Sequence, residues 1–349
     1  MQIHPEFQLH NRSFENHKDL LKHVKEKFPS HASFLEELFS DSDFIMARTS
    51  GSTGKPKPVK ISKNNLIKSA EKSINFFQLP PGTKALLNLS PQFIAGKLMW
   101  VRALTGGWNL FLSQADTAST RQILQKEKFD FGAMVPLQLS QNIELITKIK
   151  KLIIGGAPVG KKQMKEIKNL PIAVFATYGM TETITHVAVK GLNKKALEQI
   201  RGLKEGIYTA LPGIRFEKDK RNCLVIHTGY YPEAVVTNDV VELIDDHHFE
   251  WKGRFDNIIN SGGIKIQPEE IEKKLSPFIS SDFFIYALPD EKLGQRLVLV
   301  IEGKKDLDID FEKLLPKYHI PKNILFVPHF TRSFSGKIKR KETLEKAGF

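Results

Sequence analysis

The chain has 349 residues, of which 41% are hydrophobic and 26% charged, an ordinary composition for a globular protein with a large core. Its formal net charge of +13 fits nucleic acid, an anionic membrane surface or acidic small molecules as ligands. No apolar run reaches the roughly 18 residues of a membrane span, and the first residues lack the pattern of a signal peptide. The single cysteine, Cys223, excludes an internal disulfide and favours the cytoplasm.

The lysines that produce the charge are spread along the chain, and the densest cluster, residues 337–341, is short. No helix-turn-helix, zinc-finger or RNA-binding signature accompanies them. An enzyme that acts on polyanionic small molecules explains the charge as well as a nucleic-acid-binding protein does.

Apolar spacing predicts an opening helical segment up to about residue 42. Beyond it, apolar runs typical of strands alternate with helical patterns as far as residue 176, which indicates a largely parallel α/β sheet covered on both faces. The predicted strands are 43–46, 58–61, 85–89, 108–112, 131–135, 151–154 and 172–176, and the predicted helices are 64–77, one ending at 104, 120–126 and 137–146.

From about residue 203 the pattern changes to short strands and turns. A small α+β unit follows, with helices at 268–275 and 311–315, strands at 283–287 and 296–301, and a basic tail. We therefore predict a large α/β amino-terminal domain at residues 1–254 and a small α+β carboxyl-terminal domain at 255–349.

The segment between the first two predicted strands, residues 49–57, combines glycines, hydroxyl groups and two lysines. Successive backbone N–H groups in such a loop form a concavity that binds a polyphosphate. It is not a Walker loop, because Pro56 stands where Ser or Thr would bind magnesium. An ordinary Ser/Gly-rich turn is the alternative interpretation of this loop taken alone.

Two polar segments follow the carboxyl ends of predicted strands, where parallel sheets bind ligands. Gly155 and Gly156 allow a flat ring to approach the backbone, although a plain turn is favoured on this evidence alone. Residues 177–183 offer an aromatic face, hydroxyl groups and Glu182, a carboxylate that can hold magnesium. Later in the chain, Asp239 can accept the hydroxyls of a ribose. Lys337 lies on a glycine turn and, taken alone, is typical of a solvated lysine.

In this order, the segments resemble the motifs of the adenylate-forming superfamily of acyl- and aryl-CoA synthetases, luciferases and peptide-synthetase adenylation domains. The resemblance runs from about residue 44 to the end of the chain. The motifs that carry it are the 49–57 loop, Tyr178-Gly179-Met180-Thr181-Glu182, Gly253-Arg254-Phe255-Asp256 with the following Gly262-Gly263-Ile264-Lys265-Ile266, and Ser335-Gly336-Lys337-Ile338.

The resemblance implies a two-step reaction: a carboxylate attacks the α-phosphate of Mg·ATP, and a thiol, usually coenzyme A, then displaces AMP. It assigns Lys337, Thr181 and Glu182 to catalysis, with Glu182 also the ligand of Mg²⁺. Asp256 would be the hinge of a mobile carboxyl-terminal domain, and Gly262 and Gly263 would line the coenzyme A channel. The implied ATP- and AMP-binding residues are Thr49, Ser50, Gly51, Ser52, Thr53, Gly54, Lys57, Gly155, Gly156, Ala157, Tyr178, Gly179, Asp239 and Arg254.

The sequence departs from the family pattern in three places. The phosphate loop begins near residue 49, so the large amino-terminal subdomain of the family is almost wholly missing. Residues 237–239 read Thr-Asn-Asp, whereas Thr-Gly-Asp is commoner, and Phe93 occupies the place of a frequent histidine. The Phe93 change alters the gate of the acid pocket.

Within the family, the chain resembles the short form of o-succinylbenzoate–CoA ligases of menaquinone biosynthesis. That acid has a second carboxylate, which requires a cationic or donor-rich pocket. The candidate pocket residues are Phe93, Gly96, Lys97, Arg102, Thr185 and His186, with a surface position as the alternative for Lys97 and Arg102. Another aryl- or acyl-CoA ligase, a non-catalytic AMP-binding or carrier-partner module, and a nucleic-acid binder are the competing interpretations.

Overall fold

The computed structural model describes residues 1–48, 58–114, 116–303, 308–333 and 336–349. Their contacts divide the chain into two compact units. The first unit contains Met1–Gly155, Glu166–Arg215 and His227–Val235, and the second contains Gly156–Lys165, Phe216–Ile226 and Val236–Phe349.

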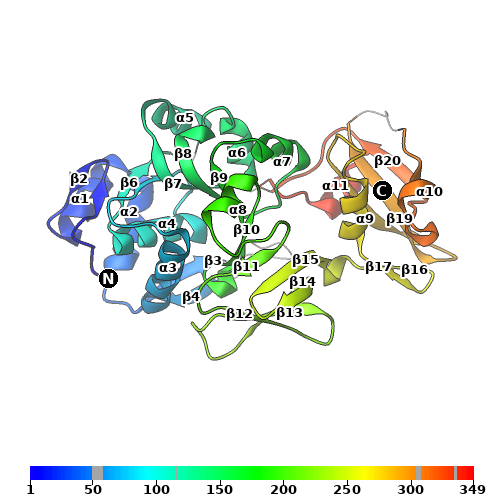
Figure 1. Cartoon of the computed structure of the whole chain (residues 1–349), viewed down its shortest axis with the longest axis horizontal. Helices are drawn as coiled ribbons and strands as arrows, with labels where there is room; N and C mark the ends of the chain where they lie inside the picture. The colour runs from blue at the N-terminus through cyan, green and yellow to red at the C-terminus, as the bar shows by residue number, and fades with distance from the viewer. Residues whose placement is uncertain (49–57, 115, 304–307, 334–335) are drawn as a thin grey trace. The chain divides into compact units, whose positions relative to one another are not determined.

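The first unit is built on a sheet with the strand order β11-β10-β9-β8-β7-β5-β6-β1-β2 (Figure 1). Neighbouring strands from β9 to β1 run parallel, whereas β10, β11 and β2 are antiparallel to their neighbours. The strands are β1 (Gln8–Leu9), β2 (Arg12–Ser13), β5 (Lys84–Leu87), β6 (Asn109–Leu112), β7 (Phe129–Met134), β8 (Ile149–Ile154), β9 (Ala173–Gly179), β10 (His186–Gly191) and β11 (Tyr208–Ala210).

The central residues of the parallel strands are apolar because helices cover both faces of the sheet, while charged residues such as Lys84, Asp130 and Lys150 stand near the amino ends of β5, β7 and β8. Leu86, Leu152 and Phe175, on three different strands, are fully buried. This arrangement confirms the predicted α/β class. The helices of this part of the chain are α1 (His17–Lys27), α2 (Pro29–Phe39), α3 (Lys63–Phe77), α4 (Ile94–Gly106), α5 (Thr117–Lys126), α6 (Pro136–Asn142), α7 (Lys161–Lys168) and α8 (Lys194–Gln199), with 3-10 turns η1 (Ile146–Lys148) and η2 (Thr181–Thr183).

The amino-terminal residues differ from the predicted helical segment. Strand β1 precedes the two helices and pairs in parallel with β6, although β6 is a hundred residues later in the chain. Two-residue strands leave no periodic signal in the sequence, so only this long-range pairing reveals them.

Strands β3 (Phe44–Arg48) and β4 (Pro58–Ser62) form a separate antiparallel pair. They agree with the strands predicted on either side of the phosphate loop. The loop itself, residues 49–57, lies outside the described residues, so its role stays a prediction.

The second unit contains two sheets. Strands β12 (Arg215–Lys218), β13 (Cys223–His227), β14 (Val235–Asp245) and β15 (His248–Arg254) are neighbours in that order. The other sheet has the order β17-β16-β19-β18, and β20 also pairs with β19. Its elements are β16 (Ile259–Ser261), β17 (Ile264–Ile266), α9 (Pro268–Leu275), β18 (Phe283–Asp290), β19 (Gly294–Glu302), α10 (Phe311–Leu314), β20 (Asn323–Val327) and α11 (Arg340–Lys346), with η3 (Phe255–Asn257) and η4 (Lys317–His319).

The two faces of this small sheet are both buried, because alternate residues of a strand point to opposite faces. Ile285 of β18 packs in one cluster with Ile271 and Leu275 of α9. Its neighbour Phe284 packs in another cluster with Leu344 of α11. The small α+β region predicted at the carboxyl terminus is therefore confirmed, with α9 and α11 on opposite sides of the sheet.

No helix in the described part of the chain is both long and apolar enough to cross a membrane.

Candidate functional site

Four of the predicted site residues come together in the second unit. Asp239 of β14 and Arg254 of β15 are paired across the two strands. The Arg254 guanidinium donates to Asp256 Oδ2 at 2.6 Å and lies 4.0 Å from Asp239 Oδ1. Asp239 is buried, and its Oδ1 accepts a hydrogen bond from Trp251 Nε1 at 3.1 Å. The strand pair therefore fixes the two predicted ribose ligands and the predicted hinge residue next to one another.

Lys337 belongs to the same group of charges. The residue as a whole is exposed, but its ammonium is partly buried. This burial is the main cause that lowers the pKa of Lys337, and the positive charge of Arg254 lowers it further. The carboxylate of Asp239 opposes this shift. Electrostatic coupling to Arg254, Asp239 and Asp256 places the ammonium near the three residues. Four residues from three motifs, up to about a hundred residues apart in the sequence, thus contribute to one charged site.

The Thr-Asn-Asp departure needs no special backbone. Asn238 lies inside β14, and it is not among the residues with positive φ. Its Oδ1 accepts from Arg221 at 2.9 Å, and Arg221 forms an ion pair with Asp219 at 2.7 Å. The asparagine is held in the strand by its neighbours, so Asp239 keeps a regular strand geometry.

The Tyr178–Thr183 motif lies at the carboxyl end of β9, in the first unit, as the sequence predicts. The Tyr178 ring lies 5.7 Å from the Tyr208 ring. A Cβ atom on Gly179 would come within 2.3 Å of the Thr185 carbonyl oxygen, so only glycine fits there. Thr181 is buried, whereas Glu182 on η2 is exposed.

The residue after this motif, Ile184, carries a strained backbone that sequence reasoning missed. Its φ of 69° lies in a region that β-branched residues rarely adopt. The side chain is fully buried, and Ile184 N–H donates to the Thr181 carbonyl at 3.0 Å. Such conformations cost about 1–3 kcal/mol and cluster at functional sites. Here the strained residue lies in the short connection between the motif and the start of β10 at His186.

The position of Glu182 fits a magnesium ligand. Its carboxylate is exposed and forms no ion pair with another described residue. Magnesium keeps several waters and needs few protein carboxylates when it binds with a phosphate substrate. A separate group of potential metal ligands, Asp245, Asp246 and His247, is exposed on the turn after β14 and coincides with no predicted site residue.

A cationic cluster is buried between helices α3 and α4 and strand β10. Arg102 of α4 is 2% exposed, and its guanidinium donates to Thr185 Oγ1 at 3.2 Å and to His186 Nδ1 at 3.4 Å. Because Nδ1 accepts, the neutral ring carries its proton on Nε2, which lies 3.2 Å from Ser73 Oγ. Burial, and then the Arg102 charge, keep the pKa of His186 well below its ordinary value. The buried position excludes the surface interpretation of Arg102.

No carboxylate among the described residues pairs with Arg102. Burial lowers its pKa to about 10, so it stays charged at neutral pH. Arg102 Nε is buried and has no hydrogen-bond partner among the described residues, and the buried hydroxyls of Tyr230 and Ser69 lie next to one another. An uncompensated buried guanidinium with an unpaired donor favours the binding of an anion, and a carboxylate matches its geometry.

Lys97, the other cation predicted for the acid pocket, is already neutralised. It is 8% exposed, which also excludes the surface interpretation for this residue. Its ammonium donates to the Met46 carbonyl at 2.7 Å and pairs with Glu37 at 3.2 Å. These contacts tie α4 to α2 and β3. A substrate role for Lys97 stays a prediction.

The other residues predicted for the acid pocket lie at the beginning of α4. Phe93 precedes the helix and is 48% exposed. A Cβ atom on Gly96 would lie 2.2 Å from the Ser90 carbonyl oxygen, so the close packing of the preceding loop requires this glycine.

The predicted adenine loop begins where β8 ends. Gly155 N–H donates to the Met134 carbonyl at 3.2 Å, and a Cβ atom there would meet Thr177 Oγ1 at 2.6 Å. Gly156 has a φ of 83°, which favours glycine. The next residue, Ala157, belongs with Gly156 to the second unit.

Gly262 and Gly263 form the two-residue turn between β16 and β17. Both have positive φ, 59° and 85°, as the hairpin turn of type I′ requires. Both are exposed, and their predicted role in the coenzyme A channel is not tested by this geometry.

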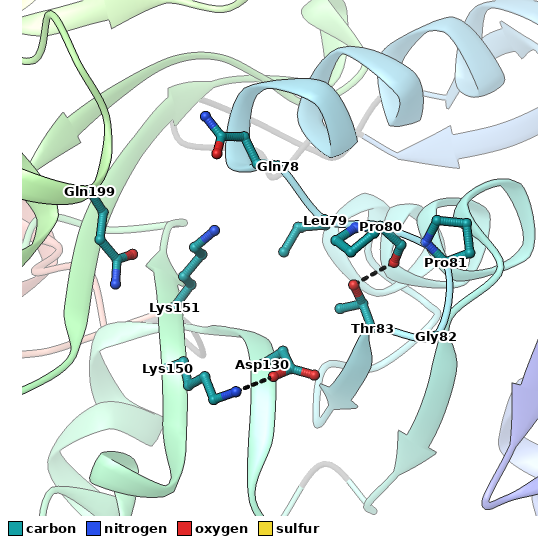
Figure 2. A pocket seen from close by; sticks show the side chains of 10 residues that line it. All are labelled: Gln78, Leu79, Pro80, Pro81, Gly82, Thr83, Asp130, Lys150, Lys151 and Gln199. Atoms are coloured by element: carbon teal, nitrogen blue, oxygen red, sulfur yellow. Dashed lines mark hydrogen bonds and ion pairs between the residues drawn. The ribbon is translucent and has the colours of Figure 1, made fainter.

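A pocket of about 340 Å³ lies away from all of these residues (Figure 2). It is at the amino ends of β5, β7 and β8, opposite the ends that carry the motifs. Figure 2 shows that Lys150 points to Asp130, with which it pairs at 2.8 Å. Lys151 donates to the Phe77 carbonyl at 2.6 Å. Because its charged groups are already paired, this pocket offers no catalytic constellation. Its lining residues are Gln78, Leu79, Pro80, Pro81, Gly82, Thr83, Asp130, Lys150, Lys151 and Gln199.

Comparisons with known proteins identify the family of the chain. The family model described as AMP-binding enzyme matches residues 11–213. A solved structure of an acyl-CoA synthetase (AMP-forming)/AMP-acid ligase II-like protein from Dyadobacter fermentans is 34% identical, with a TM-score of 0.61, and the match covers 94% of this chain and 97% of that one.

Two curated relatives differ in the acid that their names contain. A D-alanine–D-alanyl carrier protein ligase of Listeria monocytogenes is 25% identical, over 94% of this chain and 74% of the relative. A 2-succinylbenzoate–CoA ligase of Oceanobacillus iheyensis is 24% identical, over 87% of this chain and 70% of the relative.

Proposed function

Since the chain belongs to the AMP-binding enzyme family of AMP-forming acyl and aryl ligases, we propose that it is an ATP-dependent acid–CoA ligase. It activates an aryl carboxylate as an acyl-adenylate and transfers the acyl group to coenzyme A. The proposed acid is o-succinylbenzoate, an intermediate of menaquinone biosynthesis, and the name of one curated relative supports this choice.

The buried Arg102 cluster is the observation that carries the choice of acid. In an acid with two carboxylates, one carboxylate reacts with ATP, and the other needs a cationic or hydrogen-bonding partner in the pocket. Arg102 is charged, has no carboxylate partner among the described residues, and its Nε donor has no partner among them either. A second carboxylate would satisfy Arg102 Nε, which otherwise stays desolvated at a cost of about 1–3 kcal/mol.

The same cluster argues against D-alanine, the acid in the name of another relative. The amino acid carries an ammonium close to the carboxylate that is activated. An ammonium bound at Arg102 would be repelled, because two like charges in a partly buried site interact by several kcal/mol at about 4 Å. A pocket for D-alanine would need an acceptor or a carboxylate there, whereas the contacts of Arg102 among the described residues are Thr185 and His186.

In the first step, a carboxylate oxygen of the acid attacks the α-phosphorus of ATP. The bond from that phosphorus to the bridging oxygen breaks, and pyrophosphate leaves with the electron pair. Lys337 would stabilise the negative charge that develops between the carboxylate and the α-phosphate, and Thr181 would donate to the same phosphate. Mg²⁺ held by Glu182 would supply charge neutralisation on the phosphates.

In this proposal the nucleotide is held from several elements. Asp239 accepts ribose hydroxyls, and Arg254, fixed by Asp256, lies beside them. The 49–57 loop binds the β- and γ-phosphates through Thr49, Ser50, Gly51, Ser52, Thr53, Gly54 and Lys57, while Gly155, Gly156, Ala157, Tyr178 and Gly179 frame the adenine.

In the second step, the sulfur of coenzyme A attacks the acyl carbon. The carbon–oxygen bond to AMP breaks, AMP leaves with its electrons, and the thiol proton is released. We propose that residues 255–349 rotate about Asp256 between the steps, which withdraws Lys337 and brings the Gly262–Gly263 turn to the coenzyme A channel.

The test is pyrophosphate release with Mg·ATP over a panel of o-succinylbenzoate, benzoate, fatty acids and D-alanine. We expect release with o-succinylbenzoate, and a thioester after coenzyme A is added. Release with another acid only would keep the ligase and refute the assigned substrate. No release with any acid would favour a non-catalytic AMP-binding module, and transfer to a carrier protein but not to coenzyme A would refute the proposed acceptor.

A further inference from the structure

The turn that carries Lys337 is closed by its own backbone. Ser333 N–H donates to the Lys337 carbonyl at 2.8 Å, and Lys337 N–H donates to Ser333 Oγ at 3.1 Å. Lys339 N–H donates to the Thr331 carbonyl at 2.8 Å, and Gly336 has a φ of 88°. The direction in which Lys337 points therefore depends on how this turn is attached to the rest of the unit.

Helix α11 attaches the turn on its carboxyl side. Arg340, three residues after Lys337, donates to Glu272 Oε2 at 3.0 Å and to the Ile285 carbonyl at 3.2 Å. Its guanidinium also lies 3.8 Å from Glu269 Oε1. Both glutamates belong to α9, and the three side chains, Glu269, Glu272 and Arg340, are called the Arg340 cluster below. It joins the helices on the two faces of the small sheet.

The other contacts of Glu269 lead to the predicted hinge. Its Oε1 accepts from Asn257 Nδ2, and its Oε2 accepts from Gln267 Nε2. Asn257 follows the hinge residue Asp256 directly. Gln267 Nε2 also donates to the Arg254 carbonyl at 3.1 Å. A Cβ atom on Gly253 would lie 2.5 Å from Glu269 Oε2, so glycine is required for this close approach.

The charges of the Arg340 cluster do not balance, because one guanidinium faces two carboxylates. Burial raises the pKa of Glu272 to about 7, although Arg340 and the Ile285 N–H oppose the shift. Glu269 is less exposed than Glu272, and the amides of Asn257 and Gln267 provide the donors that a charged carboxylate needs. The hydrogen bonds that Glu269 accepts from Asn257 and Gln267 therefore help to stabilise its carboxylate in the Arg340 cluster.

We propose that Glu269 is a positioning residue that couples the hinge segment to the Lys337 turn, so that both move as one body. The proposal rests on the proposed function, in which Lys337 acts only in adenylation. Through Asn257 and Gln267, Glu269 holds residues 254–257, and through Arg340 it holds the lysine turn. Breaking either connection leaves the turn folded but lets the ammonium of Lys337 leave its place beside the α-phosphate.

Two variants separate positioning from folding. Glu269→Gln removes the charge that pairs with Arg340, and Asn257→Ala removes only the bond to the hinge, at a half-buried position. Glu250→Gln is the matched control, because it makes the same substitution in another glutamate that forms an ion pair. Glu250 pairs with Lys273 of α9 at 2.7 Å and contacts neither the Lys337 turn nor the hinge segment.

The first measurement is the kinetics of the two half-reactions. We expect Glu269→Gln and Asn257→Ala to lower kcat of adenylation about 10- to 100-fold, within the range typical of misplaced catalytic groups. The KM for ATP and the rate of thioester formation from supplied acyl-adenylate should stay within about twofold, and Glu250→Gln should match the wild type. An equal loss in both half-reactions, or wild-type adenylation in both variants, would overturn the proposal.

The second measurement needs no acid substrate. Hydrogen exchange of the wild type and of Asn257→Ala would compare residues 253–257 with residues 331–339. We expect faster exchange in both segments in the variant, whereas faster exchange in the hinge alone would refute the coupling. Coupled exchange in a protein that releases no pyrophosphate with any acid would keep the coupling and refute the proposed function.

Discussion

Replacing Arg102 by Met tests whether its buried charge serves the substrate or the fold. Burial lowers the pKa of Arg102 from 12.5 to about 10. At about 1.4 kcal/mol per pKa unit, keeping this charge in the folded protein costs about 3 kcal/mol. The Arg102→Met variant removes that cost. It also loses the hydrogen bonds to Thr185 and His186, which at 3.2 and 3.4 Å are long and fall at the lower end of the roughly 1.5–3 kcal/mol that each bond from a charged donor contributes.

The two effects nearly cancel, so the free energy of unfolding of Arg102→Met should stay within about 1 kcal/mol of the wild type. The melting temperature should then move by no more than about 2–4 °C. Activity should respond differently, because a charge-assisted hydrogen bond to a carboxylate contributes about 1.5–3 kcal/mol. We expect kcat/KM for o-succinylbenzoate to fall about 10- to 150-fold, while any activity with benzoate, which lacks the second carboxylate, stays unchanged.

The assay is pyrophosphate release with each acid, combined with urea unfolding of the same preparations. Arg121→Met is the matched control, because this arginine is on the surface helix α5 and pairs with Glu144 at 3.1 Å. It should leave both acids unaffected. A loss of more than about 3 kcal/mol of stability in Arg102→Met, with equal losses for both acids, would show that Arg102 is a structural residue and would refute the assignment.

Further predictions concern catalysis, pH dependence and packing. Lys337→Ala should abolish adenylation but spare thioester formation from a supplied acyl-adenylate; equal loss of both steps would contradict the hinge assignment. Removing Mg²⁺ with a chelator should abolish pyrophosphate release, and a chelator-resistant activity would argue against magnesium. His31 accepts a hydrogen bond from Trp100 at 2.9 Å, and burial lowers its pKa from 6.5 to about 4. As the pH falls from 6.5 to 4, the unfolded chain takes up the proton first, so about 3 kcal/mol of stability present above pH 6.5 should be lost. Urea unfolding at several pH values should show that His31→Gln lacks this part of the loss, and an unchanged pH dependence would count against it. Gly179→Ala should destabilise the protein by about 1–3 kcal/mol, because its Cβ would meet the Thr185 backbone. Thermal unfolding would measure this, and an unchanged melting temperature would mean that the turn can relax.

The sequence by itself determined the fold class and the family. Continuous apolar runs such as residues 152–154 predict buried parallel strands, because only a sheet covered on both faces removes every side chain of such a run from water. The order of the motifs does not depend on tertiary contacts either.

Only the tertiary structure decided which charges are compensated. Lys97 and Arg102 lie five residues apart on one helix and look equivalent in the sequence. Lys97 finds Glu37, which is 60 residues away, whereas Arg102 finds Thr185 and His186, which are more than 80 residues away and carry no negative charge.

The same reason applies to the Arg340 cluster. Glu269, Asn257 and Arg340 belong to a helix, a short turn and the basic tail, and nothing in their spacing predicts that they meet. Burial and ion pairing depend on contacts between distant segments, and local sequence patterns carry no information about them. The motifs are therefore visible in the chain, while the groups that orient them become visible only when the chain is folded.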